Sequence, residues 1–352
     1  MSNLAVRLVQ DLSFPFERPS RLRRCPALFS FQCIICFAII IVSSQNSAAE
    51  ESIIGIPDSF PLAILAPQTR VESAVVLSEN KLKLNLQTLW SNTVNRKGSS
   101  FLVDSETVIL PVDLKYGLSD DLQLGIWLPW IWRGSGIGDR GIFEWHEAFS
   151  LPQGPRDDED IEENRFQISG RKKSGGRAQL TEQGGGLGNL ELALVKRFSN
   201  SSASDSTTVY SVSSALTAPT ASDEFGLDGW GLRIGPRLSK SLSLFSLHFG
   251  ADYIYSSDIE MKGFRFAQHR AATFLAITKQ FDSFYLQLNL QGASELVSNI
   301  QRFPDFQMYT DIAAGLAVSK QVEAQLLVRE NPAPGHGTAD FTVMLGLSLL
   351  LN

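Results

Sequence analysis

The sequence predicts an all-β fold: a closed antiparallel transmembrane β-barrel of about twelve strands (range ten to fourteen) with one long extracellular loop. Three observations predict it. Apolar and polar residues alternate in segments of strand length, short and long connections alternate between the segments, and aromatic residues gather at segment ends. In "KLKLNLQTLW" (81–90), leucines share one face of the expected strand, and Lys81, Lys83, Asn85 and Gln87 share the other.

Composition limits the alternatives. The 352-residue chain is 43% hydrophobic and only 19% charged, which is less charge than the roughly 25% of soluble domains. Its net charge of −6 gives no electrostatic basis for binding nucleic acid. After residue 50 there is no uninterrupted apolar stretch of the roughly 18 residues that a spanning helix needs, so helical membrane crossing is not predicted.

The first 49 residues have the pattern of a signal peptide. Arginines precede the apolar stretch 27–42, and small residues follow it, which predicts cleavage after Ala49. A membrane anchor is the alternative, but sixteen apolar residues are short for spanning. All three cysteines lie in this leader, so the remaining chain offers no thiolate metal site and no disulfide. Residues 50–80 are expected to be a periplasmic lead-in, and 81–352 to form an outer-membrane barrel.

Twelve alternating segments predict the strands of that barrel. They are 81–90, 104–116, 121–132, 187–198, 207–217, 230–239, 242–255, 270–280, 284–294, 309–319, 322–330 and 339–351. Tight turns such as "GLSD" (117–120) alternate with longer connections, and the longest is 133–186. Short turns at one end and long loops at the other are typical of bacterial outer-membrane barrels.

Aromatic residues at the segment ends predict two interfacial belts. They are Trp90, Trp132, Trp230, Tyr255 and Tyr309 beside long loops, and Tyr116, Phe198, Phe281 and Phe284 beside short turns. A secreted β-sandwich is the competing fold, but it explains neither the belts nor the alternation of loop lengths. The apolar faces are therefore expected to contact lipid, and the polar faces to line the lumen.

The same parity gives the residues expected to line the lumen. They are Lys81, Lys83, Asp113, Lys115, Gln123, Glu191, Arg197, Arg233, Arg237, His248, Asp252, Lys279, Gln287, Asn289, Gln291, Asp311, Glu323, Gln325 and Arg329. Both charge signs are present, which leaves two interpretations open. The set forms either a ladder of paired charges or a selective lining.

The long loop 133–186 divides into two parts. The part 141–152 is aromatic and is expected to pack into or over the barrel mouth, whereas 171–186 is expected to be mobile. The candidate plug residues are Phe143, Trp145, His146 and Phe149. A site at His146 would be needed for an enzyme, but this histidine has no second metal ligand at a suitable spacing. The acidic run 156–163 and the glycine-rich 184–189 do not predict a cofactor either.

The segment 114–157, with "EWHEAF" and "LPQGPRD", resembles the domain-of-unknown-function family 3187, and "GGLGNLELALVKRF" (185–198) looks like its next block. The chain is also similar to the broader barrel family linked to phenol-degradation meta pathways, whose members are described as transporters. The resemblance implies a bacterial outer-membrane protein of Gram-negative type with no established activity.

The sequence thus favours a porin-like channel or transporter for a small-molecule solute of unknown identity, and not an enzyme. The expected partners are outer-membrane lipid and the barrel-assembly machinery, with no cofactor. Two alternatives stay open: an envelope structural or interaction barrel with a sealed lumen, and a lipid-modifying barrel enzyme with its site near His146.

Overall fold

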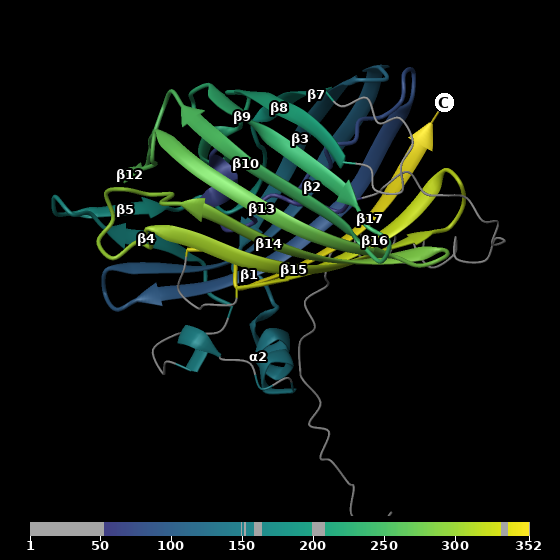
Figure 1. The fold of residues 1–352 in the computed structure, drawn as a ribbon. Helices are drawn as coiled ribbons and strands as arrows, with labels where there is room; N and C mark the ends of the chain where they lie inside the picture. Colours follow the sequence, from purple (N-terminus) through teal and green to yellow (C-terminus); the bar gives the residue numbers. More distant parts are fainter. Residues whose placement is uncertain are drawn as a thin grey trace, which may run out of the picture. The chain divides into compact units, whose positions relative to one another are not determined.

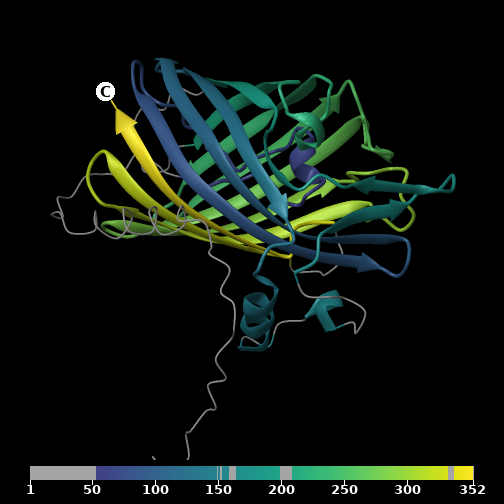
Figure 2. The same cartoon turned by 180° about the vertical axis from the view of Figure 1, so that it is seen from behind.

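The computed structural model describes residues 53–148, 150, 153–157, 164–198, 208–331 and 337–351. In this part of the chain, twelve long strands form one antiparallel ring, which β1 and β17 close by pairing with each other (Figures 1 and 2). The ring contains, in order, β1 (Leu82–Lys97), β2 (Phe101–Ser119), β3 (Leu122–Gly134), β7 (Leu190–Arg197), β8 (Thr208–Ala218), β9 (Gly231–Ser241), β10 (Ser246–Ser256), β13 (His269–Gln280), β14 (Phe284–Ser294), β15 (Phe306–Ala317), β16 (Val322–Glu330) and β17 (Phe341–Leu351). The predicted closed, twelve-stranded antiparallel barrel is confirmed.

Each predicted segment overlaps one observed strand, and the main difference concerns length. β1 and β2 have 16 and 19 residues, more than the nine to eleven or so that cross a bilayer. Both extra parts lie at the end of the barrel that carries the long connections, called here the long-loop end. The opposite end, with the tight turns, is the short-turn end.

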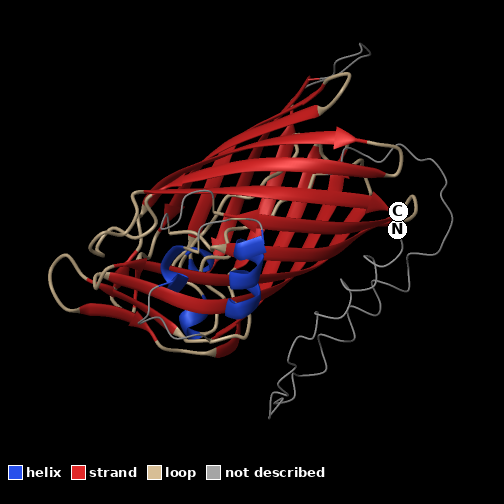
Figure 3. Cartoon of the chain, turned by 90° about the horizontal axis from the view of Figure 1, so that it is seen from below, coloured by secondary structure: helices blue, strands red, loops and turns tan. Residues whose placement is uncertain are grey.

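Shorter helices and strands lie at the long-loop end (Figure 3). They are η1 (Ala63–Leu65), α2 (Asp139–Ala148), η2 (Gly154–Asp157), β4 (Gln167–Arg171), β5 (Arg177–Leu180), β6 (Gly184–Leu187), η3 (Asp223–Phe225), β11 (Glu260–Met261) and β12 (Phe264–Arg265). β4 pairs with the extended part of β2, and β6 pairs with β3 beyond the end of β7. None of the described helices is long and apolar enough to cross a membrane.

Alternating side chains give the wall two different faces. On β14, Leu288 is 40% exposed on the outside, whereas its neighbours Gln287 and Asn289 are 2% and 0% exposed. Large apolar side chains are exposed in the same way along the other strands, so the outer surface is an apolar belt. Such a belt is unfavourable in water and is what hydrocarbon covers in a membrane barrel.

Residues 53–78 of the predicted periplasmic lead-in lie inside the ring, not outside it. Their backbone and side chains bond to inward-facing residues of the wall, from Gln287 near the first described residue to Gln123 near the last. We call residues 53–78 the plug. It consists of a rising arm (53–60), which runs toward the long-loop end, a tip (61–66) and a returning arm (67–78).

The two arms of the plug lie side by side. A Cβ atom on Gly55 of the rising arm would lie only 2.1 Å from the carbonyl oxygen of Val71 on the returning arm. The plug leaves the lumen at the short-turn end, where a Cβ atom on Gly117 would lie 2.0 Å from the Ser78 carbonyl oxygen. Both glycines therefore allow backbones to approach more closely than any side chain would permit.

The largest apolar cluster closes the long-loop end of the lumen. Its centre is the plug tip, and residues from the long connections surround it. The buried members are Phe60, Leu62, Ala63, Leu65, Ala66, Phe101, Val103, Ile168, Ala178, Leu180, Leu227, Met261, Phe264, Phe266, Leu296, Val297, Ile300, Phe303 and Ala339. We call this cluster the cap.

Candidate functional site: the lumen and its plug

The structure brings most of the predicted lumen residues together on the inner face of the wall. Those that are buried are Asp113, Gln123, Glu191, Arg233, Arg237, His248, Asp252, Gln287, Asn289, Gln291, Asp311, Gln325 and Arg329. Those that are half-buried near the short-turn end are Lys81, Lys83, Lys115, Arg197 and Glu323.

Two residues face differently from the prediction. Lys279 pairs across the sheet with Leu286, which is exposed on the outer face, so Lys279 also points outward. Tyr309, predicted for an interfacial belt, pairs with the buried Gln291 and lies inside, 4.0 Å below the Arg329 guanidinium. The face to which each residue points is set by the register of its strand with the neighbouring strands, and the predicted faces of these two residues were wrong.

The rising arm is held through its backbone. The Arg329 guanidinium donates to the Pro57 carbonyl at 2.7 Å and to the Ile56 carbonyl at 3.3 Å. Gln287 accepts from the Ile54 N–H at 3.0 Å and donates to the Ile54 carbonyl at 2.7 Å. The wall therefore holds residues 54–57 through their backbone, and it bonds to side chains only at the end of the arm, where Ser59 meets Thr342 and Asp58 accepts from Gln307.

A wall network orients the groups that hold the rising arm. Arg329 forms a bidentate pair with Asp311, at 2.6 and 3.0 Å, and Gln291 donates to the same carboxylate at 2.8 Å. All three side chains are buried, and such charge-assisted pairs are among the stronger hydrogen bonds.

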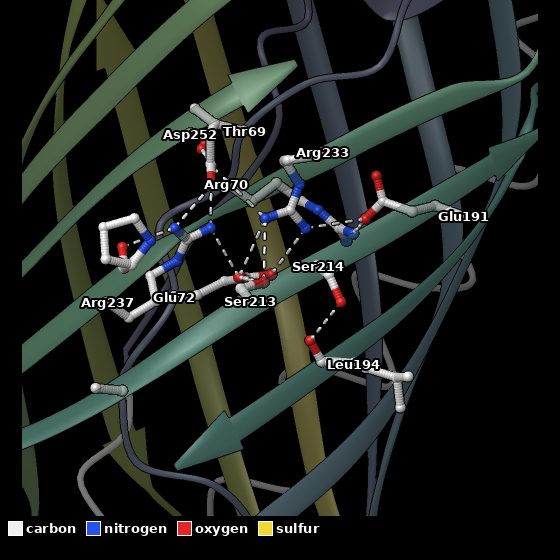
Figure 4. A network of polar contacts seen from close by, with 12 residues as sticks. Thr69, Arg70, Glu72, Glu191, Leu194, Ser213, Ser214, Arg233, Arg237 and Asp252 are labelled. Carbon is white, nitrogen blue, oxygen red and sulfur yellow. Dashed lines mark hydrogen bonds and ion pairs between the residues drawn. The ribbon is translucent and has the colours of Figure 1, made fainter. Parts of the chain in front are cut away.

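The returning arm is held through its side chains (Figure 4). The Glu72 carboxylate bridges Arg233 and Arg237 of β9, at 3.4 and 3.2 Å. Arg70 pairs with Glu191 of β7 and lies over the Trp127 ring at 4.4 Å from its centroid. Three arginines and the carboxylates of Glu72 and Glu191 thus meet in this network.

The wall arginines also pair within the wall. Arg237 forms a bidentate pair with Asp252, at 2.8 and 3.0 Å, and Arg233 lies 3.3 Å from Glu191. Burial alone raises the pKa of a carboxyl, but Arg233 and Arg237 outweigh this effect and hold the pKa of Glu72 well below its ordinary value. The returning arm is therefore bound with Glu72 ionised.

The aromatic part of the long loop does not enter the mouth. Trp145 of α2 packs against Phe341 with ring centroids 5.9 Å apart, and His146 lies 3.9 Å from the Glu330 carboxylate. Phe341 and Glu330 pair with each other on the outward parity of the wall. Phe143 is 39% exposed. The predicted plug role of these residues is therefore not what the structure shows, and Phe149 lies outside the described residues.

Two features explain this correction. The plug tip already fills the mouth, and the long ends of β1 and β2 extend the wall so that α2 packs on its outer side (Figures 1 and 2). Asp139 at the start of α2 accepts from Asn92 of β1 at 2.7 Å. The second part of the loop, expected to be mobile, instead contains the β4–β5 hairpin, which contributes Ile168, Ala178 and Leu180 to the cap.

Two small cavities lie beside the plug. One cavity of about 50 Å³ lies between the tip, the returning arm and the wall at Trp127 and Pro129. Another, of about 80 Å³, lies at the short-turn end between Glu72, Lys83 and Lys115. These two cavities have room for a few water molecules each and not for a solute.

The plug residues Ile54, Pro57, Arg70 and Glu72 were not among the residues predicted from the sequence. One signal was present. The stretch "IIGIPDSFPLAILAP" (53–67) is strongly apolar and contains three prolines, which suits neither a solvated lead-in nor a central strand. An apolar segment with no strand period needs another place to be buried.

Comparison with known proteins places the chain in a family. A family model described as "Protein of unknown function (DUF3187)" matches residues 30–349, nearly the whole chain. This match confirms the resemblance predicted from 114–157. The search of curated proteins finds no match for this chain.

Solved structures show a similar fold. The COG4313 outer membrane channel from Pseudomonas putida F1 superposes with a TM-score of 0.53 at 15% sequence identity, covering 79% of this chain and 98% of that one. A KdgM porin in complex with disordered oligogalacturonate gives a TM-score of 0.41 at 6% identity, covering 77% of this chain and 99% of its own. At 15% identity the likeness to the COG4313 channel concerns the fold alone, which is that of an outer-membrane barrel.

Proposed function

Because this chain belongs to DUF3187, a family of unknown function, we propose its function from its structure: it is an outer-membrane channel for small molecules, closed by its own plug. The apolar belt supports a position in the bilayer, and the proposed orientation has the long-loop end outside the cell and the short-turn end in the periplasm. Export by the leader 1–49 belongs to this proposal. The solute is small, and its identity is a separate question.

One observation carries the proposal: the central arginines of the inner wall keep carboxylate partners without the plug. Arg237 pairs with Asp252, Arg233 with Glu191, and Arg329 with Asp311, and all of these partners belong to the wall. The charges that the plug adds to this network, those of Arg70 and Glu72, cancel each other. Withdrawal of the plug therefore leaves these three arginines paired, which lowers the usual obstacle to opening an ionic interior.

A sealed structural barrel is the second candidate. The apolar cap favours it, because Phe60 and Leu62 of the plug are fully buried among loop residues. Moving this tip into water would expose a large apolar area. The two candidates differ in whether the tip leaves its position, and that movement can be blocked.

A reversible cross-link tests the choice. The Ser59 hydroxyl of the plug lies 2.7 Å from the Thr342 hydroxyl of β17, so a Ser59→Cys/Thr342→Cys pair has its sulfur atoms within reach of each other. The other cysteines of the chain are those of the leader. In planar bilayers we expect conductance events from the reduced protein, their loss on oxidation and their return on reduction. Silence in both states, from folded protein, would favour the sealed barrel.

A further inference from the structure

The inner wall beside the plug tip carries a group of neutral polar side chains. Thr93 and Asn95 of β1 and Ser105 and Thr107 of β2 face inward, and each is only 1% exposed. Thr93 pairs directly with Ser105 across the two strands. The four side chains therefore form one small patch on the wall, just below the cap.

These side chains have no hydrogen-bond partner among the residues that the structure describes. This holds for the hydroxyl oxygens of Thr93, Ser105 and Thr107 and for both amide atoms of Asn95. Deeper in the lumen the same strands behave differently, because Asn85 donates to Asp113 at 2.7 Å. Buried polar groups are normally paired, so four adjacent exceptions need an explanation.

The plug tip covers the patch without matching it. Ser91, one inward position below Thr93, donates to the Ser59 carbonyl at 3.4 Å. Val103, which pairs with Asn95, and Phe101 above it pack in the cap with Phe60. The patch thus lies between the levels of Ser59 and Phe60 of the plug, and in this closed state it is buried and unsatisfied.

We propose that Thr93, Asn95, Ser105 and Thr107 form a binding subsite for small neutral polyhydroxylated solutes, which becomes accessible when the plug tip leaves. This inference rests on the proposed channel function and names its solute class. Hydroxyl and amide groups both donate and accept, as the hydroxyls of a sugar do. None of the four groups is charged, so the patch offers no counter-ion to a charged solute.

The rings beside the patch fit the same chemistry. Phe101 lies next to Phe303, with ring centroids 5.0 Å apart, and both now contact the plug tip or its neighbours. An apolar surface beside a few convergent polar groups is the usual composition of a small-molecule site. A sugar ring has both an apolar C–H face and a polar hydroxyl edge. Such a solute competes with the tip for the same wall, so its binding favours the open state.

Equilibrium binding of radiolabelled maltose to the full-length protein in detergent tests the subsite. In the Ser59→Cys/Thr342→Cys background, we expect saturable binding after reduction and little after oxidation, because the locked tip covers the patch. Adding Thr93→Val and Thr107→Val removes two hydroxyls at nearly constant volume and should weaken binding about tenfold. Thr278→Val is the matched control, because its buried hydroxyl is also unpaired but lies near the short-turn end of β13.

The outcomes separate the two proposals. Equal weakening by the Thr93/Thr107 and Thr278 variants, or no saturable maltose binding by the reduced protein, would overturn the subsite and leave its hydroxyls as sites for ordered water only. Binding with the expected differences from a barrel that never conducts would support the subsite and refute the channel. Conductance without binding would do the reverse.

Discussion

The two arms of the plug lie against each other in one lumen, yet the wall holds them by different chemistry. On the rising arm, wall side chains bond to backbone groups of Ile54, Ile56 and Pro57. On the returning arm, the charged side chains of Arg70 and Glu72 bond to charged wall residues.

This difference determines where each arm can be weakened. The carbonyl groups of Ile54, Ile56 and Pro57 are backbone groups, so the specificity of these contacts lies in the wall, above all in Arg329 and Gln287. The returning arm depends on its own charges, so a single plug substitution can loosen it without changing the wall. Substitutions in wall and plug therefore separate the two contributions.

The largest effect is expected for Arg329→Met. This change removes the donors to the rising arm and leaves Asp311 buried without its partner, which costs about 3–5 kcal/mol for a buried pair. Urea unfolding followed by the heat-dependent gel mobility of the folded barrel would measure it. Arg265→Met is the control, because its pair with Glu260 is exposed. A loss no larger than that of the control would contradict the assigned role of Arg329.

The second largest effect is expected for Glu72→Gln. This change weakens the charge-assisted contact to Arg233 and Arg237 but leaves the wall pairs intact, so the free energy that holds the returning arm should fall by about 1.5–3 kcal/mol. The barrel should stay folded while the open probability in planar bilayers rises. Glu79→Gln, an exposed residue beyond the plug, is the matched control. If both variants gate like the parent, the ionic network does not hold the returning arm.

The strands of the wall could be predicted from the sequence, whereas the two arms of the plug could not. The strands were predictable because successive side chains of a strand point to opposite faces of the wall. The resulting alternation of apolar and polar residues is visible within each short stretch of sequence. The position of Glu72 between Arg233 and Arg237 depends on contacts 161 and 165 residues away in the chain, and no local pattern encodes them.

The long loop illustrates the same limit. Its aromatic residue Trp145 contacts Phe341 of the barrel but stays 39% exposed, on the outer one of the two surfaces that were open to it. The inner surface was already occupied by the tip, which the sequence analysis had placed outside. Because the plug was expected outside the barrel, the aromatic part of the long loop was expected at the mouth.

A smaller loss of the free energy that holds the returning arm, about 0.5–1.5 kcal/mol, is expected for Ser239→Ala. This change removes the hydroxyl that accepts from the Ala74 N–H at 2.9 Å. Ser211→Ala is the control, because that hydroxyl is buried on the same inner face but bonds to no described residue. We expect a modest rise in open probability for Ser239→Ala alone. A larger effect than that of Glu72→Gln would mean that neutral contacts, and not charges, dominate the returning arm.

The smallest effect is expected from mild acid. Because the pKa of Glu72 lies below its ordinary value of 4.5, its contribution to holding the plug is fully present above that pH and declines only below it. Burial raises the pKa of Asp58 at the end of the rising arm, so acid neutralises this carboxyl first, which favours the docked tip. Single-channel recordings at pH 8 and at about pH 5 should therefore show no increase in opening on acidification. A steep increase over this range would show that some other titrating group controls the plug, and would remove the Glu72 bridge as the main hold on the returning arm.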